Sequence, residues 1–508
     1  MTVQNEETIL NKSSLRRRTL IKVFLFFVLV CAFFLTVWAI TTYDSLNLSE
    51  IMYHLRVPVT GTSRGLIVDG AIWTLIPSLL STALFGILIW PKEEGSRFAA
   101  TSMSGKKWKS RLSKAIVIAL IILEVFLVQY NLDVYGYVKA QFTYSSFIEN
   151  NYVDSDDVLR APSEKRNLVF IYLESVESSF MDKESGGSMD QNLLTGLTKL
   201  AAENVNFSHN EKIGGFRNSS CTSWTAGSIF GTTTGLPLKM PIATTGLTKV
   251  EEFFPGVTSL GDILEAEGYT NLLMMGSDST FAGKRMFYDQ HGNYLIKDLV
   301  WAQKAGFVTQ DYEGEWGFED HKLFDFAKDE LSRLSSMEKP FVFTMLTLDT
   351  HFENEEVCEY CPDTYDNDYF NIVACSDNLV TEFVYWMQEQ DFYENTTVII
   401  IGDHLTMNAE CCEDIPYEER AIYNCFLNSA AVPVNTKNRE FMATDIFPTT
   451  LAALGYKIEG NRLGLGTNLF SDKETLAEEL GVEELDERFL DRSHFYENKF
   501  IFNLNRYR

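Results

Sequence analysis

The chain has 508 residues, of which 45% are hydrophobic and 22% charged, and its formal net charge is −27 at pH 7. This length suggests about three units of roughly 150 residues, and the composition excludes both a disordered chain and a wholly membrane-embedded one. The acidity argues against a nucleic-acid partner, because phosphate backbones are bound by basic surfaces. An anionic substrate would need local compensation from a metal ion or from a few placed cations.

Three apolar stretches near the N-terminus predict membrane helices. They cover about residues 19–43, 66–90 and 115–131, and the first two reach the roughly 20 residues that a helix needs to cross a bilayer. Buried core helices are the alternative, but residues 21–39 carry no charge beyond Lys22, which favours the membrane. Three successive spans without a small-residue cleavage site are also unlike a secretory signal peptide.

The charges of the connecting loops predict the orientation of these spans. Arg16, Arg17 and Arg18 precede the first span, whereas the connection from residue 44 to residue 64 is nearly free of Lys and Arg. The loop between the second and third spans is basic, with Lys92, Arg97, Lys106, Lys107, Lys109, Arg111 and Lys114. By the positive-inside rule, the N-terminus and this loop are cytoplasmic, and everything after about residue 131 lies outside.

Cysteine usage agrees with an exported domain. Cys31 lies in a span, and the other seven cysteines lie in the part predicted to be outside the cytoplasm, where disulfides can form. They are Cys221, Cys358, Cys361, Cys375, Cys411, Cys412 and Cys425. The pair at 358 and 361 could instead be half of a zinc ribbon, but no second CxxC pair follows, which favours disulfides.

The exported part has the pattern of an α/β domain. Residues 132–166 are expected to form a linker, residues 167–470 the domain itself, and residues 471–508 an extension that is acidic and at first helical. Strands are predicted at 168–173, 272–275, 340–348 and 397–401, and helices at 193–200, 260–265, 316–335 and 376–390. Uninterrupted apolar strands that alternate with helices indicate a mainly parallel sheet covered by helices on both faces.

Polar side chains follow three of these strands directly. Glu174 follows the first strand, Asp349 and His351 follow the third, and Asp403 and His404 follow the fourth. One acidic residue after a strand is usually a helix cap. Three such strand ends, two of them with a histidine, lie where α/β folds bind ligands and predict a divalent metal site.

A separate segment offers a nucleophile. Residues 214–227 form a small, hydroxyl-rich turn that contains Thr222 and leads into an apolar segment. A hydroxyl at a helix N-terminus can face an anion bound by backbone N–H groups, and a metal-bound hydroxyl can accept a phosphoryl group. The local sequence alone favours the simpler interpretation, in which Thr222 caps a helix.

These motifs, in their order along the chain, resemble the lipid-dependent phosphoglycerol transferases of the alkaline phosphatase and sulfatase superfamily. The likeness is greater to the members that modify periplasmic glucans than to the lipoteichoic acid synthases. The matching segments are 167–175, 221–227, 234–237, 253–255, 260–264, 281–284, 291–292, 316–318, 346–351, 374–376, 403–405 and 445–450. The resemblance implies a membrane-anchored enzyme with the fold of that superfamily.

The resemblance also implies roles for individual residues. It implies a divalent metal, manganese first and zinc or magnesium as alternatives, held by Glu174, Thr222, Asp403 and His404. Thr222 would then be the nucleophile rather than a cap, and His351 would contact the phosphoglycerol and assist proton transfer. Further substrate contacts are expected from Lys284, Trp316 and Asp349, and a disulfide bond from Cys361 and Cys375.

The implied reaction moves glycerol phosphate from phosphatidylglycerol, through a phospho-Thr222 intermediate, to a hydroxyl of a cell-envelope glycan. The chain would be a multi-pass protein of the bacterial inner membrane, with its catalytic domain on the extracytoplasmic side. A phosphoethanolamine transferase and a phospholipid-hydrolysing phosphodiesterase remain as alternatives. A sulfatase is disfavoured because residues 221–225 lack the Cys/Ser-x-Pro-x-Arg pattern. A non-enzymatic lipid or glycan sensor is disfavoured because every expected site position is filled.

Overall fold

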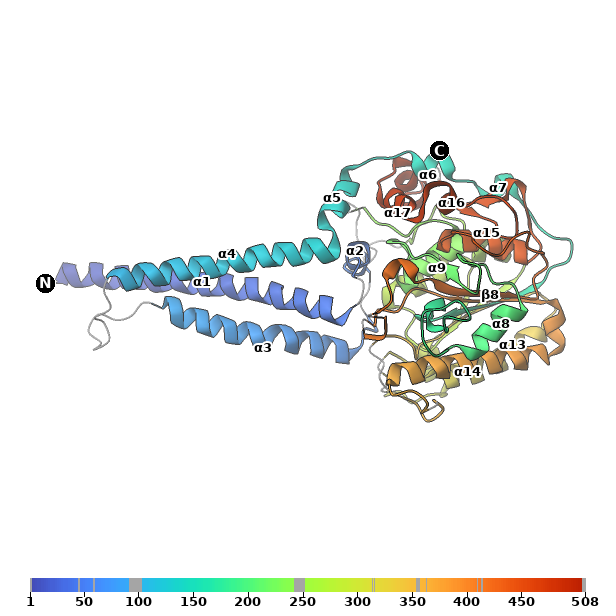
Figure 1. Ribbon diagram of the computed structural model, residues 1–508, viewed down its shortest axis with the longest axis horizontal. Coiled ribbons are helices and arrows are strands. Elements are labelled where there is room, and N and C mark those ends of the chain that lie inside the picture. Colours follow the sequence, from blue (N-terminus) through green and yellow to red (C-terminus); the bar gives the residue numbers. More distant parts are fainter. Residues whose placement is uncertain are drawn as a thin grey trace. The chain divides into compact units, whose positions relative to one another are not determined.

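The computed structural model describes residues 2–43, 46–57, 60–90, 103–241, 252–312, 314, 316–352, 357–361, 363–408, 410–412 and 414–504 (Figure 1). The chain divides into two compact units, one of residues Met1–Leu46 with Arg64–Tyr135 and one of residues Asn47–Ser63 with Gly136–Arg508. Lys92 and Arg97, which belong to the predicted cytoplasmic loop, lie outside the described residues.

The first unit consists of long apolar helices. They are α1 (Thr2–Thr42), α3 (Arg64–Ile89) and α4 (Met103–Leu132). Each contains a segment long and apolar enough to cross a membrane, which confirms the three predicted spans; these segments are Ser14–Thr42, Arg64–Ile89 and Trp108–Leu132. The rings of Phe26 and Phe85 stack between α1 and α3 with their centroids 3.9 Å apart. Most other apolar side chains of these helices are exposed, as expected of surfaces that contact lipid.

The second unit is built on a seven-stranded sheet within the described residues, with the order β3-β8-β7-β2-β6-β4-β5. Its strands are β2 (Asn167–Leu173), β3 (Gly215–Phe216), β4 (Thr270–Met275), β5 (Leu295–Lys297), β6 (Phe341–Leu346), β7 (Thr396–Gly402) and β8 (Ile422–Leu427). Strands β2, β4, β5, β6 and β7 run parallel, and β8 and β3 add antiparallel pairs at one edge. The predicted mainly parallel sheet is thereby confirmed.

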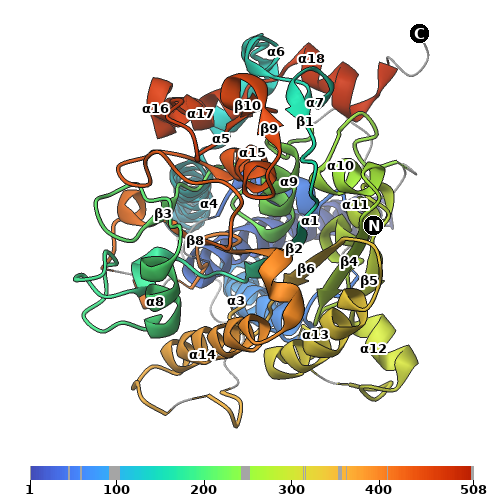
Figure 2. The same cartoon turned by 90° about the vertical axis from the view of Figure 1, so that its right-hand side faces the viewer.

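Helices cover both faces of this sheet (Figure 2). On one face lie α8 (Thr195–Glu203), α13 (Asp320–Ser335) and α14 (Asp368–Gln388), and on the other lie α9 (Thr225–Thr234), α10 (Leu260–Ala266) and α15 (Ala443–Ala453). Alternate side chains of β2 enter the two cores, because successive residues of a strand point to opposite faces. Val169 and Ile171 join the core beneath α13 and α14, whereas Phe170 and Tyr172 join the core beneath α9 and α15.

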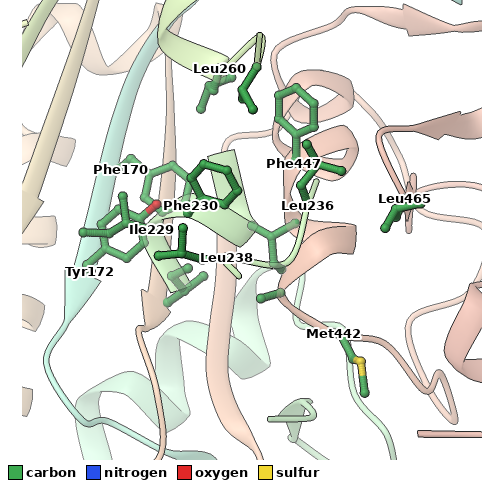
Figure 3. Packing of buried hydrophobic residues seen from close by; sticks show 14 of the residues in the cluster. Phe170, Tyr172, Ile229, Phe230, Leu236, Leu238, Leu260, Met442, Phe447 and Leu465 are labelled. Carbon is green, nitrogen blue, oxygen red and sulfur yellow. The ribbon is translucent and has the colours of Figure 1, made fainter. Parts of the chain in front are cut away.

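The second of these cores fixes the position of α9, as Figure 3 shows. Phe170 and Tyr172 of β2 pack near Ile229 and Phe230 of α9. The Tyr172 hydroxyl also shares a 2.8 Å hydrogen bond with Oγ1 of Thr232, and both side chains are buried. The N-terminal end of α9 is therefore held at a fixed place relative to the carboxyl end of β2.

The remaining elements of the second unit are short. They are α2 (Leu48–His54), α5 (Val134–Phe142), α6 (Phe147–Asn151), α7 (Ser155–Val158), α11 (Lys284–Gln290), α12 (Leu299–Ala305), α16 (Leu476–Leu480), α17 (Val482–Leu490) and α18 (His494–Tyr496). Short strands form two antiparallel pairs, β1 (Leu159–Arg160) with β9 (Lys457–Ile458) and β10 (Arg462–Leu463) with β11 (Gly466–Thr467). Single turns occur at η1 (Ser178–Phe180), η3 (Phe281–Gly283), η4 (Asp391–Asn395), η5 (Glu410–Cys412), η6 (Tyr417–Glu419), η7 (Glu459–Asn461) and η8 (Glu497–Ile501).

Two segments outside the predicted domain pack onto it. Ile148, from the region predicted as a linker, is buried in the same core as α9. Leu485, Phe489 and Tyr496, from the C-terminal extension, are buried in that core as well. Both segments are therefore parts of the folded unit.

One predicted helix boundary is wrong for a clear physical reason. The helix expected from residue 316 begins only at Asp320. Gly317 lies in an extended segment that bridges to Ser277, and a Cβ at Gly317 would lie 2.1 Å from the carbonyl oxygen of Gly276. A close backbone approach, which only glycine permits, replaces the first helical turn there.

Candidate active site

The register of two parallel strands brings Glu174 and Asp403 together. Leu173 at the end of β2 pairs with Gly402 at the end of β7, and the backbone N–H of Asp403 donates to the Leu173 carbonyl at 3.1 Å. Glu174 and Asp403 are therefore neighbours at the carboxyl edge of the sheet. With His404 they form a group whose potential ligand atoms all lie within 4.8 Å of one another, and all three side chains are buried.

Ser175 orients both carboxylates. Its backbone is in the left-handed region, with φ 55°, which costs a non-glycine residue about 1–3 kcal/mol. In this conformation its N–H donates to Oδ1 of Asp403 at 2.8 Å, and its hydroxyl donates to Oε1 of Glu174 at 2.9 Å. The strained turn thus holds the two acids in place.

His404 lies between the two carboxylates. Its Nδ1–H donates to the carbonyl of Leu405 at 2.8 Å. Its Nε2 then lies 3.3 Å from Oε1 of Glu174 and 3.5 Å from Oδ2 of Asp403. Burial alone would lower the pKa of His404, but the carboxylates of Asp403 and Glu174 raise it to about 10.

The same contacts shift the pKa values of the acids in opposite directions. Burial would raise the pKa of Glu174, but the charge of His404 lowers it to about 2. For Asp403, burial and then the charge of Glu174 raise the pKa to about 7. Opposed shifts within one cluster are typical of functional sites.

The three side chains fit a divalent metal ion. Oδ2 of Asp403 is buried and has no hydrogen-bond partner among the described residues. Two carboxylates and an imidazole are ligands that zinc and manganese accept. A metal ion held by these groups would give Oδ2 of Asp403 a partner and would replace the proton on Nε2 of His404. The structure therefore brings together three of the four predicted ligands.

The hydroxyl beside this cluster belongs to Thr225 and not to Thr222. Oγ1 of Thr225 lies 3.4 Å from Oε2 of Glu174 and 3.5 Å from Nε2 of His404. Thr222 is buried with its methyl group toward α9, where a Cβ at Gly231 would lie 2.9 Å from it. Within the described part of the chain, no hydrogen bond joins the Thr222 hydroxyl to Glu174, Asp403 or His404. The structure thus does not place Thr222 where the sequence analysis expected it, and Thr225 has that position instead.

Thr225 was missed because several hydroxyl residues share one turn. Thr225 is the first residue of α9, and the preceding residue, Trp224, makes no side-chain cap. The unsatisfied N–H groups of a helix N-terminus favour a bound anion. The start of the apolar helical pattern after residue 224 was the signal that could have identified Thr225.

Lys284 supplies a positive charge near the carboxylates of Glu174 and Asp403. It is the first residue of α11, it is 6% exposed, and its Nζ lies 4.9 Å from the ring of Phe281. Burial lowers the pKa of Lys284 to about 8, and the charges of Glu174 and Asp403 act against that shift. The contact of Lys284 with a phosphate group remains a prediction, and its position beside the two carboxylates is compatible with that contact.

His351 and Trp316 lie against each other, with their ring centroids 4.4 Å apart. Nδ1–H of His351 donates to the carbonyl of Phe352 at 2.8 Å, which leaves Nε2 as an acceptor. Burial lowers the pKa of His351, while the charge of Glu174 raises it, so that Glu174 is close enough to act on the ring. Nε1 of Trp316 is buried without a hydrogen-bond partner in the described residues. His351 is therefore close to Glu174, and Trp316 packs directly against His351.

Asp349 holds the loop that carries His351. Both of its carboxylate oxygens accept from the backbone N–H of Asp320, each at 3.2 Å. The carboxylate of Asp320 in turn accepts from the N–H groups of Leu348, at 2.7 Å, and Asp349, at 3.1 Å. This reciprocal pair ties α13 to the end of β6, and the predicted role of Asp349 in substrate binding stays a prediction.

Three cysteines gather near this edge of the domain. Sγ atoms of Cys358, Cys361 and Cys375 lie within 4.8 Å of one another, and those of Cys358 and Cys361 are 3.3 Å apart. All three are free thiols here. The predicted bond between Cys361 and Cys375 therefore stays a prediction, now with a competing partner in Cys358.

Comparison with known proteins places this site in a family. Residues 166–456, more than half of the chain, match the Sulfatase family. Phosphoglycerol transferase I of Salmonella choleraesuis and that of Salmonella typhimurium are each 29% identical over 331 residues, which is 64% of this chain and 41% of the relative. The chain thus spans about two fifths of the length of these relatives.

A solved structure extends the likeness of fold to nearly the whole chain. The integral membrane protein lipooligosaccharide phosphoethanolamine transferase A of Neisseria meningitidis matches with a TM-score of 0.50 and 13% identity, over 85% of this chain and 84% of that one. At this identity the match shows the fold alone. Because the family match covers more than half of the chain, and the sheet carries the expected acidic and histidine side chains at its carboxyl edge, the chain belongs to the sulfatase family.

Proposed function

We propose that this chain is a membrane-anchored phosphotransferase that moves sn-glycerol phosphate from phosphatidylglycerol to a hydroxyl of a cell-envelope glycan. The observation that carries the proposal is the hydroxyl of Thr225 beside Glu174 and His404. The relatives named phosphoglycerol transferase I support the choice of head group. Three membrane-spanning helices would keep the enzyme at the surface that holds a lipid donor.

Thr225 is the proposed nucleophile in place of Thr222. In the first half-reaction, Oγ1 of Thr225 attacks the phosphorus of the donor and a new Thr–O–P bond forms. The bond from phosphorus to the diacylglycerol oxygen breaks, Thr225 loses its proton, and the diacylglycerol oxygen gains one. Neutral diacylglycerol leaves, and glycerol phosphate stays on Thr225.

Glu174, Asp403 and His404 would hold the metal, with manganese preferred and zinc or magnesium as alternatives. When bound, such an ion lowers the pKa of a coordinated hydroxyl and offsets negative charge on phosphate oxygens. Lys284 adds a second positive charge, which also stabilises the charge that develops on the phosphoryl oxygens. A strongly acidic protein needs this local compensation in order to bind a phosphodiester.

In the second half-reaction a glycan hydroxyl attacks the phosphorus of phospho-Thr225. His351 is the proposed base, because its Nε2 is an acceptor and burial keeps the ring neutral near pH 7. The hydroxyl proton passes to Nε2 of His351, the glycan–O–P bond forms, the Thr225 O–P bond breaks, and the departing Thr225 oxygen takes up the proton that His351 releases. The site is then ready for another donor.

The proposed location of this chemistry is the extracytoplasmic side of a bacterial inner membrane. The basic residues Lys109, Arg111 and Lys114 precede the apolar part of the third span, and Arg16, Arg17 and Arg18 precede that of the first. With three spans, these charges direct residues after α4 outward. The acceptor glycan and the lipid donor are both available there.

The test is release of diacylglycerol from defined lipids. The purified full chain in detergent, with manganese, is given mixed micelles that contain phosphatidylglycerol or phosphatidylethanolamine. We expect diacylglycerol from phosphatidylglycerol, and no release after chelation of the metal. Release from phosphatidylethanolamine alone would overturn the head-group assignment in favour of a phosphoethanolamine transferase. Release at the same rate with and without a glycan acceptor, with free glycerol phosphate as the product, would indicate a hydrolase.

A further inference from the structure

We propose that the segment of residues 46–57, which contains α2 and connects the first two membrane spans, forms one wall of the active site, where Glu50 and His54 bind the hydroxyl-bearing end of the lipid head group. The identity of this ligand rests on the proposed function. Residues 47–57 of this segment, which include all of α2, belong to the same compact unit as the catalytic domain.

The hydrophobic face of the segment is part of the domain core. Tyr53 is 3% exposed and Val57 is also buried, and both belong to the same core cluster as α9. The ring of Tyr53 lies 5.5 Å from that of Trp224, the residue directly before Thr225. The Tyr53 hydroxyl donates to the carbonyl of Ala282 at 2.8 Å. The segment is thus folded onto the domain next to the nucleophile.

Polar contacts fix the beginning of α2 to the turn that carries the nucleophile. Asn47 caps α2, since its Oδ1 accepts from the N–H of Ser49 at 2.7 Å. Its Nδ2 donates to the carbonyl of Ser220 at 2.6 Å and lies 3.4 Å from Oγ of Ser223. One side chain therefore caps the helix and joins it to residues 218–224.

A row of aromatic rings joins α2 to the proposed base. The ring of His54 stacks on Phe281 with a centroid distance of 5.7 Å, and Phe281 lies 5.6 Å from Trp316. Trp316 in turn lies 4.4 Å from His351. These contacts place His54 on the same wall of the site as His351 and beside the loop that leads to Lys284.

Glu50 and His54 face the charged groups of the site. Oε1 of Glu50 is 3.9 Å from Nε2 of His54, one helical turn later, and the two side chains are 17% and 29% exposed. Burial raises the pKa of Glu50 to about 7, and the charge of His404 opposes that shift. Burial lowers the pKa of His54 to about 4, and the charge of Lys284 lowers it further. The ring of Phe281 contacts both His54, at 5.7 Å, and Nζ of Lys284, at 4.9 Å, so the Glu50–His54 pair lies beside the proposed phosphate-binding lysine.

The chemistry of this pair suits the end of the head group that is remote from phosphorus. A carboxylate repels phosphate, which the metal and Lys284 would bind, but it accepts strongly from hydroxyl groups. The neutral imidazole of His54 offers one donor and one acceptor. The two hydroxyls of a glycerol head group can donate to the Glu50 carboxylate and can exchange hydrogen bonds with the donor and the acceptor of the His54 ring. An ethanolamine ammonium would also donate to Glu50, so the test includes both head groups.

The first test compares two probes on the full-length, manganese-loaded protein. Calorimetry measures binding of sn-glycerol 1-phosphate and of inorganic phosphate to the wild type, Glu50→Ala, Glu50→Gln, His54→Ala and Leu55→Ala. Leu55 is in the same segment but is 74% exposed, so it serves as the matched control. We expect Glu50→Ala and His54→Ala each to weaken glycerol phosphate about tenfold, and Glu50→Gln to weaken it less. Phosphate affinity should change by less than about twofold, in keeping with a contact remote from phosphorus.

Equal losses for both probes would show that α2 only supports the fold, and unchanged affinities would show that it makes no contact; either result overturns the proposal. In turnover, Glu50→Ala should raise KM for phosphatidylglycerol with little change in kcat. If KM rises only for phosphatidylethanolamine, the proposal that Glu50 binds glycerol hydroxyls is wrong. A wild type that prefers glycerol phosphate to phosphate but releases no diacylglycerol would count against the proposed function alone. If the wild type binds glycerol phosphate no more tightly than inorganic phosphate, the proposal that this segment binds the head group is wrong.

Discussion

The hydroxyl oxygen of Thr225 lies 3.4 Å from Oε2 of Glu174, across the carboxyl edge of the central sheet. Glu174 follows β2, and Thr225 begins α9, so the distance between them depends on how that helix packs on that strand. The buried hydrogen bond between Tyr172 and Thr232 joins the same two elements. The site is therefore assembled by the core of the domain rather than by its loops alone.

The nucleophile assignment predicts unequal effects at two neighbouring threonines. Thr225→Ala should lower diacylglycerol release by on the order of 10³-fold or more, because the covalent step is lost. Thr222→Ala should keep the rate within about tenfold, because Thr222 contributes packing next to Gly231 and no contact to the ligands. Steady-state rates with phosphatidylglycerol check both variants. A fully active Thr225→Ala together with an inactive Thr222→Ala would restore the original expectation.

The ligand assignment predicts loss of metal from two conservative variants. Glu174→Gln and Asp403→Asn keep the shape of each side chain but remove the negative charge that a divalent ion requires, so affinity should fall at least about tenfold. Elemental analysis after dialysis measures the metal that stays bound. Asp190→Asn, at an exposed position, is the matched control and should keep the wild-type content. Unchanged metal in both site variants would disprove the ligand set.

Metal binding should release a proton. The pKa of His404 is raised to about 10 by the nearby carboxylates, so its Nε2 is protonated in the metal-free site at neutral pH. A metal ligand must be deprotonated, and binding therefore displaces this proton. Affinity should rise by about tenfold per pH unit between pH 7 and 9, with a further contribution near pH 7 from Asp403. Calorimetry in two buffers of different ionisation enthalpy counts the protons, and a count near zero would show that His404 is already neutral.

The C-terminal extension should support the nucleophile turn. Asp486 on α17 accepts from the N–H of Ser220 at 2.7 Å and from its hydroxyl at 2.6 Å. Asp486→Ala should therefore lower the free energy of unfolding by about 2 kcal/mol and slow turnover, since both donors lose a charged acceptor. Thermal unfolding and initial rates test this, with Glu483→Ala, at an exposed position of the same helix, as the control. If Asp486→Ala and Glu483→Ala have the same free energy of unfolding and the same initial rate, the extension does not support the nucleophile turn.

The cysteine prediction is decided by peptide mapping without reduction. If the domain is exported, we expect Cys361 bonded to Cys375 and Cys358 as a free thiol. A bond between Cys358 and Cys361, whose Sγ atoms lie 3.3 Å apart, would contradict this expectation. Mass spectrometry of the alkylated, unreduced protein distinguishes the two pairings.

That Glu174, Asp403 and His404 lie together was predictable from sequence, and the reason is geometric. Glu174, Asp403 and His404 directly follow apolar strands, and the carboxyl ends of parallel strands meet at one edge. Asp349 follows a strand as well, but it bonds to the N–H of Asp320 because α13 begins there rather than at residue 316. A strand-end acid can thus be a ligand or a cap, and only the position of the next helix separates the two.

The other contributors to the site had weaker signals. Thr225 shares its turn with several hydroxyl residues, and only the first residue of α9 distinguishes it. Residues 47–57 lie between two membrane spans, and the scarcity of basic residues in this connection indicates only on which side of the membrane it lies. Their partners, such as Ser220 for Asn47, are more than a hundred positions away. Local periodicity carries no information on contacts at that separation.

If Thr225 is the nucleophile, it carries the glycerophosphoryl group between the two half-reactions, and this modification can be mapped to a single residue. The manganese-loaded protein is mixed with phosphatidylglycerol without an acceptor, quenched in acid and digested with trypsin. Cleavage after Arg217 and Lys239 gives one peptide, residues 218–239, that holds both Thr222 and Thr225. Fragment-ion spectra should place a glycerophosphoryl group on Thr225. The same group on Thr222, with Thr225 unmodified, would contradict the assignment.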